Sequence, residues 1–270
     1  MARGSIPHYC VQLMPAGGAA VAGAQRNLSS ALEWEREAMD TAVLTGRTEV
    51  HLCSAADAQT LGAPVHREVL DPFLALRQEA RRAGFDLAID SGFRSFDRQL
   101  SIWNRKVDGQ LPVLDSAAVP LDIGGLSERD LVVAILRWSA LPGASRHHWG
   151  TDLDVFDAAA RPEGYEVELI PAEVNPGGMF GPLHEWLDSR IAVGAAFGFF
   201  RPFDLDRNGV APERWHLSCA PVAAPFQTGL TVDVLGETVA AADLRLKHVV
   251  LQHLDEIYHR FVINTGRPPA

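Results

Sequence analysis

Two short segments of the chain combine residue types that can bind a metal ion and activate water. The first runs from Ser145 to Asp154 and contains His147, and the second runs from Glu213 to His216. A catalytic zinc ion takes three nitrogen or carboxylate ligands and keeps a fourth position for water or substrate. His147, Asp154 and His216 are therefore the candidate ligands, and Glu213 places a further carboxylate beside one of them.

The first segment must bend for its two candidate ligands to face one ion. Gly150 lies between His147 and Asp154 and lets the chain turn back at that point. Because side chains alternate along a strand, Asp152 and Asp154 are expected on one face, with Leu153 in the core.

The second segment constrains where its strand begins. On a continuous strand, Glu213 and Trp215 share one face and His216 takes the other. Both Glu213 and His216 can face the ion only if the strand starts at about Arg214, with Glu213 in the preceding loop.

Several common catalytic signatures are absent from the sequence. Neither the G-x-x-x-x-G-K-[ST] phosphate loop nor a G-x-G-x-x-G motif after a strand occurs. Gly143 and Ser145 have the spacing of a nucleophile elbow, but the closing glycine is missing. His184 opens a segment like the H-E-x-x-H zinc helix, but Asp188 occupies the position of the second histidine.

Composition excludes several classes of partner. The 270 residues carry 24 Lys and Arg against 34 Asp and Glu, a formal net charge of −10, and 47% are hydrophobic. An acidic chain without a Lys/Arg-rich run is not expected to bind nucleic acid or an anionic membrane. The apolar stretch 191–200 is far shorter than the roughly 20 residues that span a bilayer, so no membrane span is expected. The three cysteines have neither disulfide-scaffold nor zinc spacing.

The amino-terminal stretch is too interrupted by proline, glycine and polar residues to predict an export signal. A cytoplasmic location is therefore favoured, and a periplasmic one stays open if the protein is exported by another route or if the sequence is trimmed at its start. The oligomeric state is left open.

The elements that must position the candidate ligands indicate an α+β fold, because helices and short strands mix without a regular βαβ rhythm. A small antiparallel sheet is expected to carry the site, flanked by helices. Expected strands cover 85–90, 152–156, 165–170 and 215–219. Expected helices cover 29–45, 69–82, 96–107, 127–141, 182–197 and 239–262. We predict a single domain, 1–270, with a catalytic core at about 86–219 and mainly helical additions at 1–65 and 220–270.

These motifs resemble those of a known family. Segment 145–154, with its Ser-x-His-x-x-Gly-x-x-x-Asp pattern, and segment 213–216, Glu-x-Trp-His, resemble the zinc D-Ala-D-Ala carboxypeptidases and dipeptidases of the vancomycin-resistance type. Upstream, 91–95 is similar to that family's Ser-Gly-aromatic-Arg-Ser turn, and Gln99 to its downstream glutamine. Three motifs in the same order span most of the predicted core.

The resemblance implies a role for each matching residue. His147, Asp154 and His216 would bind one Zn²⁺ ion, and Glu213 would take a proton from the metal-activated water and return it to the leaving amine. Arg94 would bind the substrate carbonyl and stabilise the oxyanion.

Three further residues are expected to form the substrate site: Ser145 in the pocket, Gln99 in support of Arg94, and Trp215. Asp152 departs from the family pattern, which usually has a small residue there; it could face the metal or bind a ligand histidine. His148 is a rival of His147, which the motif register favours.

The leading hypothesis is a zinc peptidase that cleaves the bond before a C-terminal D-amino acid of a small peptide or muropeptide. One alternative is an endopeptidase that cuts inside the stem peptide or cross-link. Another is a non-catalytic, zinc-stabilised binding domain, as in the hedgehog-type relatives of the fold. Glu213 and Arg94 argue against the last, since a structural ion needs neither a base nor an oxyanion group.

Overall fold

The computed structural model describes residues 40–268, and its centre is a four-stranded antiparallel sheet. The strands are β1 (Leu87–Ser91), β2 (Asp152–Asp157), β3 (Phe199–Phe200) and β4 (His216–Cys219), in the order β1-β2-β4-β3. The two central strands, β2 and β4, are buried along their whole length. The predicted α+β class with a small antiparallel sheet is confirmed.

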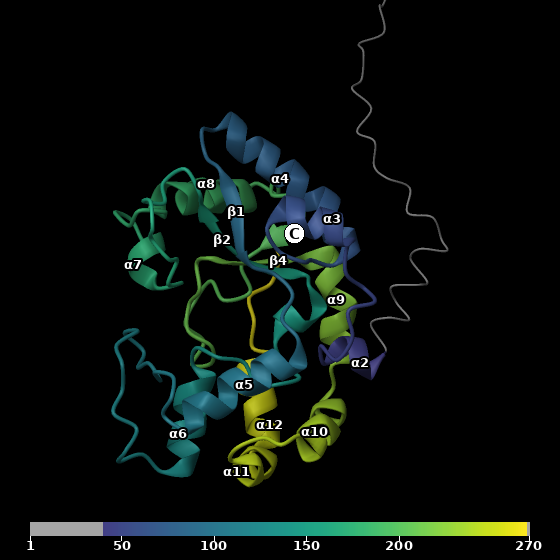
Figure 1. Cartoon of the computed structure of the whole chain (residues 1–270), viewed down its shortest axis with the longest axis vertical. Helices are drawn as coiled ribbons and strands as arrows, with labels where there is room; N and C mark the ends of the chain where they lie inside the picture. The colour runs from purple at the N-terminus through teal and green to yellow at the C-terminus, as the bar shows by residue number, and fades with distance from the viewer. Residues whose placement is uncertain (1–39, 269–270) are drawn as a thin grey trace, which may run out of the picture.

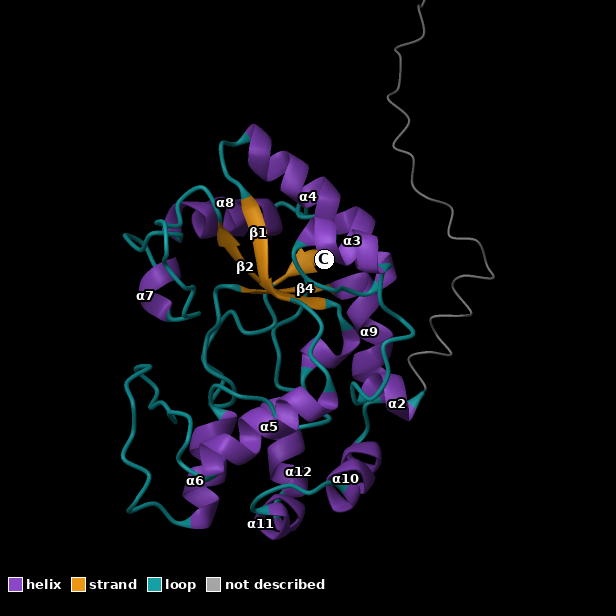
Figure 2. Ribbon diagram, viewed as in Figure 1, coloured by secondary structure: helices purple, strands orange, loops and turns teal. Residues whose placement is uncertain are grey.

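Helices flank the sheet in two groups. Those near the sheet are α3 (Ala55–Leu61), α4 (Leu70–Arg82), α8 (Gly181–Ala192) and α9 (Ala220–Gly229). Those gathered at the other end of the molecule are α5 (Phe96–Val107), α6 (Glu128–Leu136), α10 (Val232–Ala241), α11 (Lys247–Gln252) and α12 (Leu254–Ile257) (Figure 1). In Figure 2 the strands lie above this second group of helices, and long loops run between the sheet and these helices. Short helical elements are α2 (Thr41–Leu44), α7 (Pro171–Val174), two 3₁₀ turns, Arg67–Val69 and Arg146–Trp149, and a π-helix, Tyr258–Val262.

Capping serines and a glycine beyond a helix end mark the bounds of helices whose predicted and observed ranges agree best. The Ser95 side chain accepts a hydrogen bond from the Arg98 amide and caps α5, and Ser127 caps α6 through the amide of Asp130. Gly84, just beyond the end of α4, has a φ of +93°. The expected helices over 69–82 and 96–107 are therefore present.

The expected strand over 165–170 is wrong, because a buried carboxylate binds its backbone instead. Glu173 accepts hydrogen bonds from the amides of Glu168 and Ile170 and from the hydroxyl of Tyr165. Leu169 has a φ of 55°, in the left-handed region. These contacts hold the segment as a loop against α7, with no strand of the sheet beside it.

The single helix expected over 239–262 is also wrong. The segment contains the end of α10, then α11, α12 and the π-helix. Leu246 has a φ of 57°, and Arg245 donates its amide to Asn104 and its carbonyl accepts from the Trp103 indole. Pairing with α5 therefore requires a non-helical backbone between α10 and α11.

Other differences are smaller. Helix α6 ends at Leu136 rather than Leu141, and α8 ends at Ala192, before Gly194 with a φ of +68°. The helix expected over 29–45 falls mostly outside the described residues, where only α2 can be compared. β3 and α3 were not predicted, and α9 was predicted only as part of a mainly helical addition.

One hydrophobic cluster packs residues from Val43 to Phe261, and so includes both flanking regions as well as the sheet. Among residues 40–268, none of the helices combines the length and apolar character that crossing a bilayer requires.

Candidate metal centre

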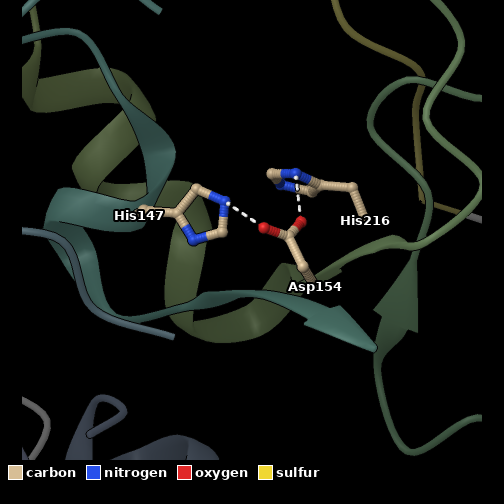
Figure 3. Close-up of side chains that lie close together, drawn as sticks. All are labelled: His147, Asp154 and His216. Carbon is tan, nitrogen blue, oxygen red and sulfur yellow. Dashed lines mark ion pairs between the residues drawn. The ribbon is translucent and has the colours of Figure 1, made fainter. Parts of the chain in front are cut away.

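The three predicted ligands come together at one end of the two central strands (Figure 3). His147 belongs to the 3₁₀ turn that precedes β2, Asp154 lies on β2, and His216 begins β4 directly opposite Asp154 in the antiparallel register. One potential ligand atom from each lies within 4.8 Å of the other two, and all three residues are buried. Pairing of β2 with β4 therefore brings together residues from two distant segments.

Gly150 provides the turn between the first two ligands. It follows the 3₁₀ turn with a φ of +64°, and its amide donates to the carbonyl of His147. A Cβ at this position would lie 2.6 Å from the backbone nitrogen of His66. Glycine is thus required both by the left-handed backbone and by the close approach of a neighbouring chain segment.

Hydrogen bonds identify which nitrogen each histidine presents to an ion. Nδ1 of His147 donates to the carbonyl of Gly92 at 2.8 Å, so Nε2, 3.3 Å from Oδ2 of Asp154, is left to coordinate. In His216 the roles are reversed: Nε2 lies 2.9 Å from Oδ1 of Asp152, and Nδ1 lies 3.3 Å from Oδ1 of Asp154. The two imidazoles thus offer opposite ring nitrogens.

The donor set fits a metal ion. Two imidazole nitrogens and one carboxylate form the three-ligand arrangement of catalytic zinc sites. Oδ1 of Asp154 is buried and receives no hydrogen bond, although Nδ1 of His216 lies close to it. A buried carboxylate oxygen without a hydrogen bond is costly unless a cation binds it.

Charges in the cluster reinforce one another. Burial opposes ionisation of Asp154, but the imidazoles of His147 and His216 outweigh it and hold the pKa of the carboxyl well below its ordinary value. Burial likewise opposes protonation of His216, but the neighbouring carboxylates of Asp152, Asp154 and Glu213 favour the charged imidazolium and raise the pKa of His216 well above its ordinary value of 6.5. The buried negative charge of the candidate ligands therefore favours a bound proton or a cation at this point.

Glu213 lies in the loop before β4, as expected, although the strand starts at His216 rather than Arg214. Its amide donates to the carbonyl of Phe203, and its Oε2 lies 3.3 Å from Nδ1 of His216. The carboxylate is thus on the metal-facing side of that ring, with its side chain 12% exposed.

Arg94 reaches the cluster from the turn after β1. Its amide donates to the carbonyl of His147, and one guanidinium nitrogen lies 3.9 Å from Oδ2 of Asp154. The guanidinium also donates to Oε1 of Gln99 and to the hydroxyl of Ser91. Gln99 is buried and donates to a carbonyl in the segment after α6, so it supports Arg94, as expected, and does not line the cavity.

A cavity of about 240 Å³ adjoins the cluster. Ser145 and Trp215 line it, as expected, together with Arg94 and Glu213. Sequence reasoning missed the walls that other elements supply: Lys106, Leu114, Trp138, Phe261 and Val262. Trp138 stacks on Trp215 with ring centroids 6.3 Å apart. No motif surrounds these residues, so only the folded arrangement reveals them.

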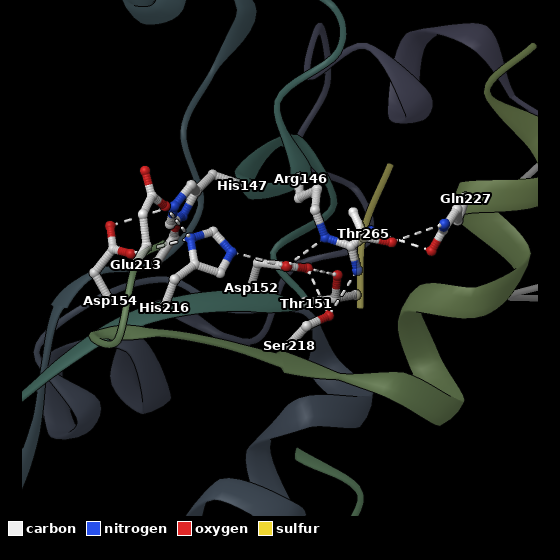
Figure 4. A network of polar contacts seen from close by, with 11 residues as sticks. Arg146, His147, Thr151, Asp152, Asp154, Glu213, His216, Ser218, Gln227 and Thr265 are labelled. Atoms are coloured by element: carbon white, nitrogen blue, oxygen red, sulfur yellow. Dashed lines mark hydrogen bonds and ion pairs between the residues drawn. The ribbon is translucent and has the colours of Figure 1, made fainter. Parts of the chain in front are cut away.

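The structure shows where the side chains of His148 and Asp152 lie, which the sequence left open. His148 is not in the cluster: its Nδ1 donates to the carbonyl of Arg94, its Nε2 accepts from the amide of Gly143, and burial lowers its pKa to about 3. Asp152 binds a ligand histidine rather than facing the ion, and it belongs to a polar network that extends away from the cluster (Figure 4).

Comparisons with known proteins point to one family. Residues 62–222 match the family model described as VanY, D-alanyl-D-alanine carboxypeptidase. Two Haemophilus influenzae proteins, both described as uncharacterized, are similar: one is 32% identical over 130 residues, covering 46% of this chain and 93% of the relative, and the other is 38% identical over 99 residues, covering 37% and 68%.

Three solved structures show a partial similarity to this chain. They include VanYB in complex with D-alanine-D-alanine (20% identity, 73% of this chain and 92% of that chain, TM-score 0.45). A second is a mutant of the D,D-pentapeptidase VanY in complex with Zn(II) (20%, 74% and 89%, TM-score 0.44). A third is the LD-carboxypeptidase LdcB (23%, 63% and 67%, TM-score 0.40).

Proposed function

Because the chain belongs to the VanY D-alanyl-D-alanine carboxypeptidase family, we propose that it is a zinc-dependent peptidase. Its substrate would be a peptidoglycan-type peptide, cut before a C-terminal D-amino acid. The observation that carries the proposal is the convergence of His147, Asp154 and His216 on one point beside a cavity that Glu213 and Arg94 also line.

The three ligands would hold the ion through Nε2 of His147, a carboxylate oxygen of Asp154 and Nδ1 of His216. When bound, Zn²⁺ supplies Lewis-acid polarisation of the scissile carbonyl and lowers the pKa of water. Such a centre has three protein ligands and an open position, whereas structural zinc sites use four.

Glu213 would act as the general base. Its carboxylate is held near the ligands by the loop before β4 and can take a proton from the attacking water while oxygen bonds to the carbonyl carbon. As the carbon–nitrogen bond breaks, Glu213 returns that proton to the leaving amine, so no covalent enzyme intermediate is needed.

Arg94 would bind the carbonyl oxygen of the scissile bond, where negative charge develops. Gln99 and Ser91 hold the guanidinium in place, and an oriented positive charge costs little reorganisation during the reaction. Ser145 and Trp215 would contact the peptide from the cavity wall.

An endopeptidase is the second candidate, and a neighbouring cleft favours it. This cleft, of about 580 Å³, is lined by Asp90, Arg98 and Phe93 and shares Arg94 with the metal cavity. It offers room for a longer peptide beside the reacting bond. A non-catalytic binding domain is less well supported, because a structural ion needs neither the Glu213 carboxylate nor the Arg94 guanidinium that line the cavity beside the candidate ligands.

Product analysis by mass spectrometry tests the proposal. Zinc-loaded protein is incubated with stem peptides ending in D-alanine, with and without a chelator. Release of one terminal D-amino acid supports the carboxypeptidase, and an internal cut supports the endopeptidase. Absence of any chelator-sensitive cleavage would contradict both.

A further inference from the structure

Asp152 lies beside the candidate metal centre but contacts the far side of one ligand's ring. On the β2–β4 ladder Asp152 is opposite Ser218 and Asp154 is opposite His216, so both aspartates reach His216 on one face of the sheet. Oδ1 of Asp152 is 2.9 Å from Nε2, whereas Oδ1 of Asp154 is 3.3 Å from Nδ1. Figure 4 shows the imidazole between Asp154 and Glu213 on one side and Asp152 on the other.

Both oxygens of the Asp152 carboxylate are occupied as acceptors. Oδ1 accepts from Nε of Arg146 at 2.7 Å as well as from His216, and Oδ2 accepts from the hydroxyls of Thr151 at 2.6 Å and Ser218 at 3.1 Å. The side chain is completely buried. A carboxylate surrounded by donors holds the proton of His216 on Nε2 and leaves the lone pair on Nδ1.

We propose that Asp152 is a positioning residue that fixes the tautomer and ring orientation of His216, so that Nδ1 faces the ion. A carboxylate that accepts from the free nitrogen of a coordinating histidine orients the ring and makes it a stronger ligand. The inference rests on the proposed metal centre and adds a residue outside the ligand set.

The guanidinium of Arg146 compensates the buried negative charge of Asp152. Asp152 would otherwise be a second buried negative charge close to Asp154, and burying an unpaired charge is costly. The guanidinium is itself fixed, because its terminal nitrogens donate to the Ser218 hydroxyl at 2.7 Å and to Oε1 of Gln227 at 3.2 Å. It also lies over the ring of Trp149, 4.9 Å from the centroid.

The network continues into the part of the chain beyond the family match, which ends at residue 222. Gln227 lies on α9, and its amide donates to the hydroxyl of Thr265 at 3.4 Å. Both residues therefore lend support to Arg146, and through it to the orientation of His216.

Zinc affinity tests the proposal without relying on turnover. Metal-free protein competes for zinc ions with a chromogenic chelator of known affinity. Asp152→Ala leaves Arg146 without its partner, so the double variant Asp152→Ala/Arg146→Met, which removes both charges, guards against misfolding. We expect the double variant to bind zinc about 10- to 100-fold more weakly than the unmodified protein.

Two further variants separate positioning from general effects. Asp152→Asn keeps an oxygen that can accept from Nε2, so we expect an intermediate affinity. Asp157→Asn is the matched control, because Asp157 is a buried aspartate on the same strand that accepts from the amides of Asp86 and Ala159 and does not contact the centre. Its zinc affinity should equal that of the unmodified protein.

A spectroscopic signature complements the affinities. In the zinc-loaded protein, ¹⁵N spectra of the histidine rings should show a proton on Nε2 of His216, and this signal should exchange faster or vanish in the double variant. If the unmodified protein binds zinc and the folded double variant binds it within threefold, this inference is overturned while the proposed function stands. If the unmodified protein binds no zinc, the proposed function itself fails.

Discussion

Replacing Gly150 with alanine tests whether the turn between two ligands is as constrained as the structure indicates. Gly150 has a φ of +64°, and its carbonyl accepts from the amide of His66 at 2.8 Å. A Cβ would lie 2.6 Å from that same nitrogen and 3.0 Å from Cδ2 of Leu52. Either the turn or the segment of His66 must then move.

Two contributions determine the size of the effect. A left-handed backbone costs a residue with a Cβ about 1 kcal/mol. Overpacking against a neighbouring backbone adds about 1–3 kcal/mol. We therefore expect Gly150→Ala to lower the free energy of unfolding by about 3 kcal/mol, and to weaken zinc binding because His147 and Asp154 lie on either side of the turn.

Gly164 provides the matched control. It has a φ of +75°, but a Cβ there would meet nothing within 4 Å, so Gly164→Ala should cost only the backbone contribution of about 1 kcal/mol. Urea unfolding of the metal-free proteins, followed by circular dichroism, measures both values. Equal losses for the two variants would refute the reasoning, since the close approach to His66 would then cost nothing.

Three other outcomes are expected. Arg94→Ala should lower kcat by about 10²- to 10³-fold while the metal content stays unchanged, as measured by turnover and atomic emission; an unaltered kcat would remove Arg94 from the mechanism. Zinc should raise Tm in the unmodified protein but not in His147→Ala, because a ligand that binds only the folded state stabilises it; equal shifts in scanning calorimetry would remove His147 from the centre. Burial lowers the pKa of His51 to about 4 and of His66 to about 3. Below pH 6.5 these two imidazoles therefore bind protons in the unfolded chain but stay neutral in the folded chain. As the pH is lowered from 6.5 to about 4, the free energy of unfolding should therefore decrease by about 1.4 kcal/mol per pH unit for each of the two histidines. A urea midpoint that does not change with pH would contradict this.

The candidate ligands could be named from the sequence because they lie in two compact motifs that resemble those of a known family. A glycine between His147 and Asp154 and the start of a strand after Glu213 leave few arrangements in which these residues could meet. The structure brings them together as expected, although their catalytic roles stay predictions until variants are measured.

Features that depend on distant contacts could not be predicted. The loop over 165–170 has the apolar alternation of a strand, but Glu173, which lies beyond it, binds its amides. The break near Leu246 depends on hydrogen bonds to α5, far away in the sequence. The same limit applies to Trp138 in the cavity wall, which stacks on Trp215 and donates its indole N–H to the carbonyl of Asp115.

The role of Asp152 illustrates what structure adds to motif reading. Alternation placed Asp152 and Asp154 on one face and left open whether the extra carboxylate would face the metal. Only the strand register and the buried Arg146 show that it binds Nε2 of His216 instead.

The most direct test of the central claim compares the unmodified protein with Glu213→Gln, both loaded with zinc, on a stem peptide ending in D-alanine. Glutamine keeps the size of the side chain but cannot accept the proton from water. We predict one zinc ion per chain in both proteins and a loss of D-alanine release of about 10²- to 10⁴-fold in the variant. Release at the unmodified rate, with zinc fully bound, would contradict the claim that this metal centre and Glu213 carry out peptide hydrolysis.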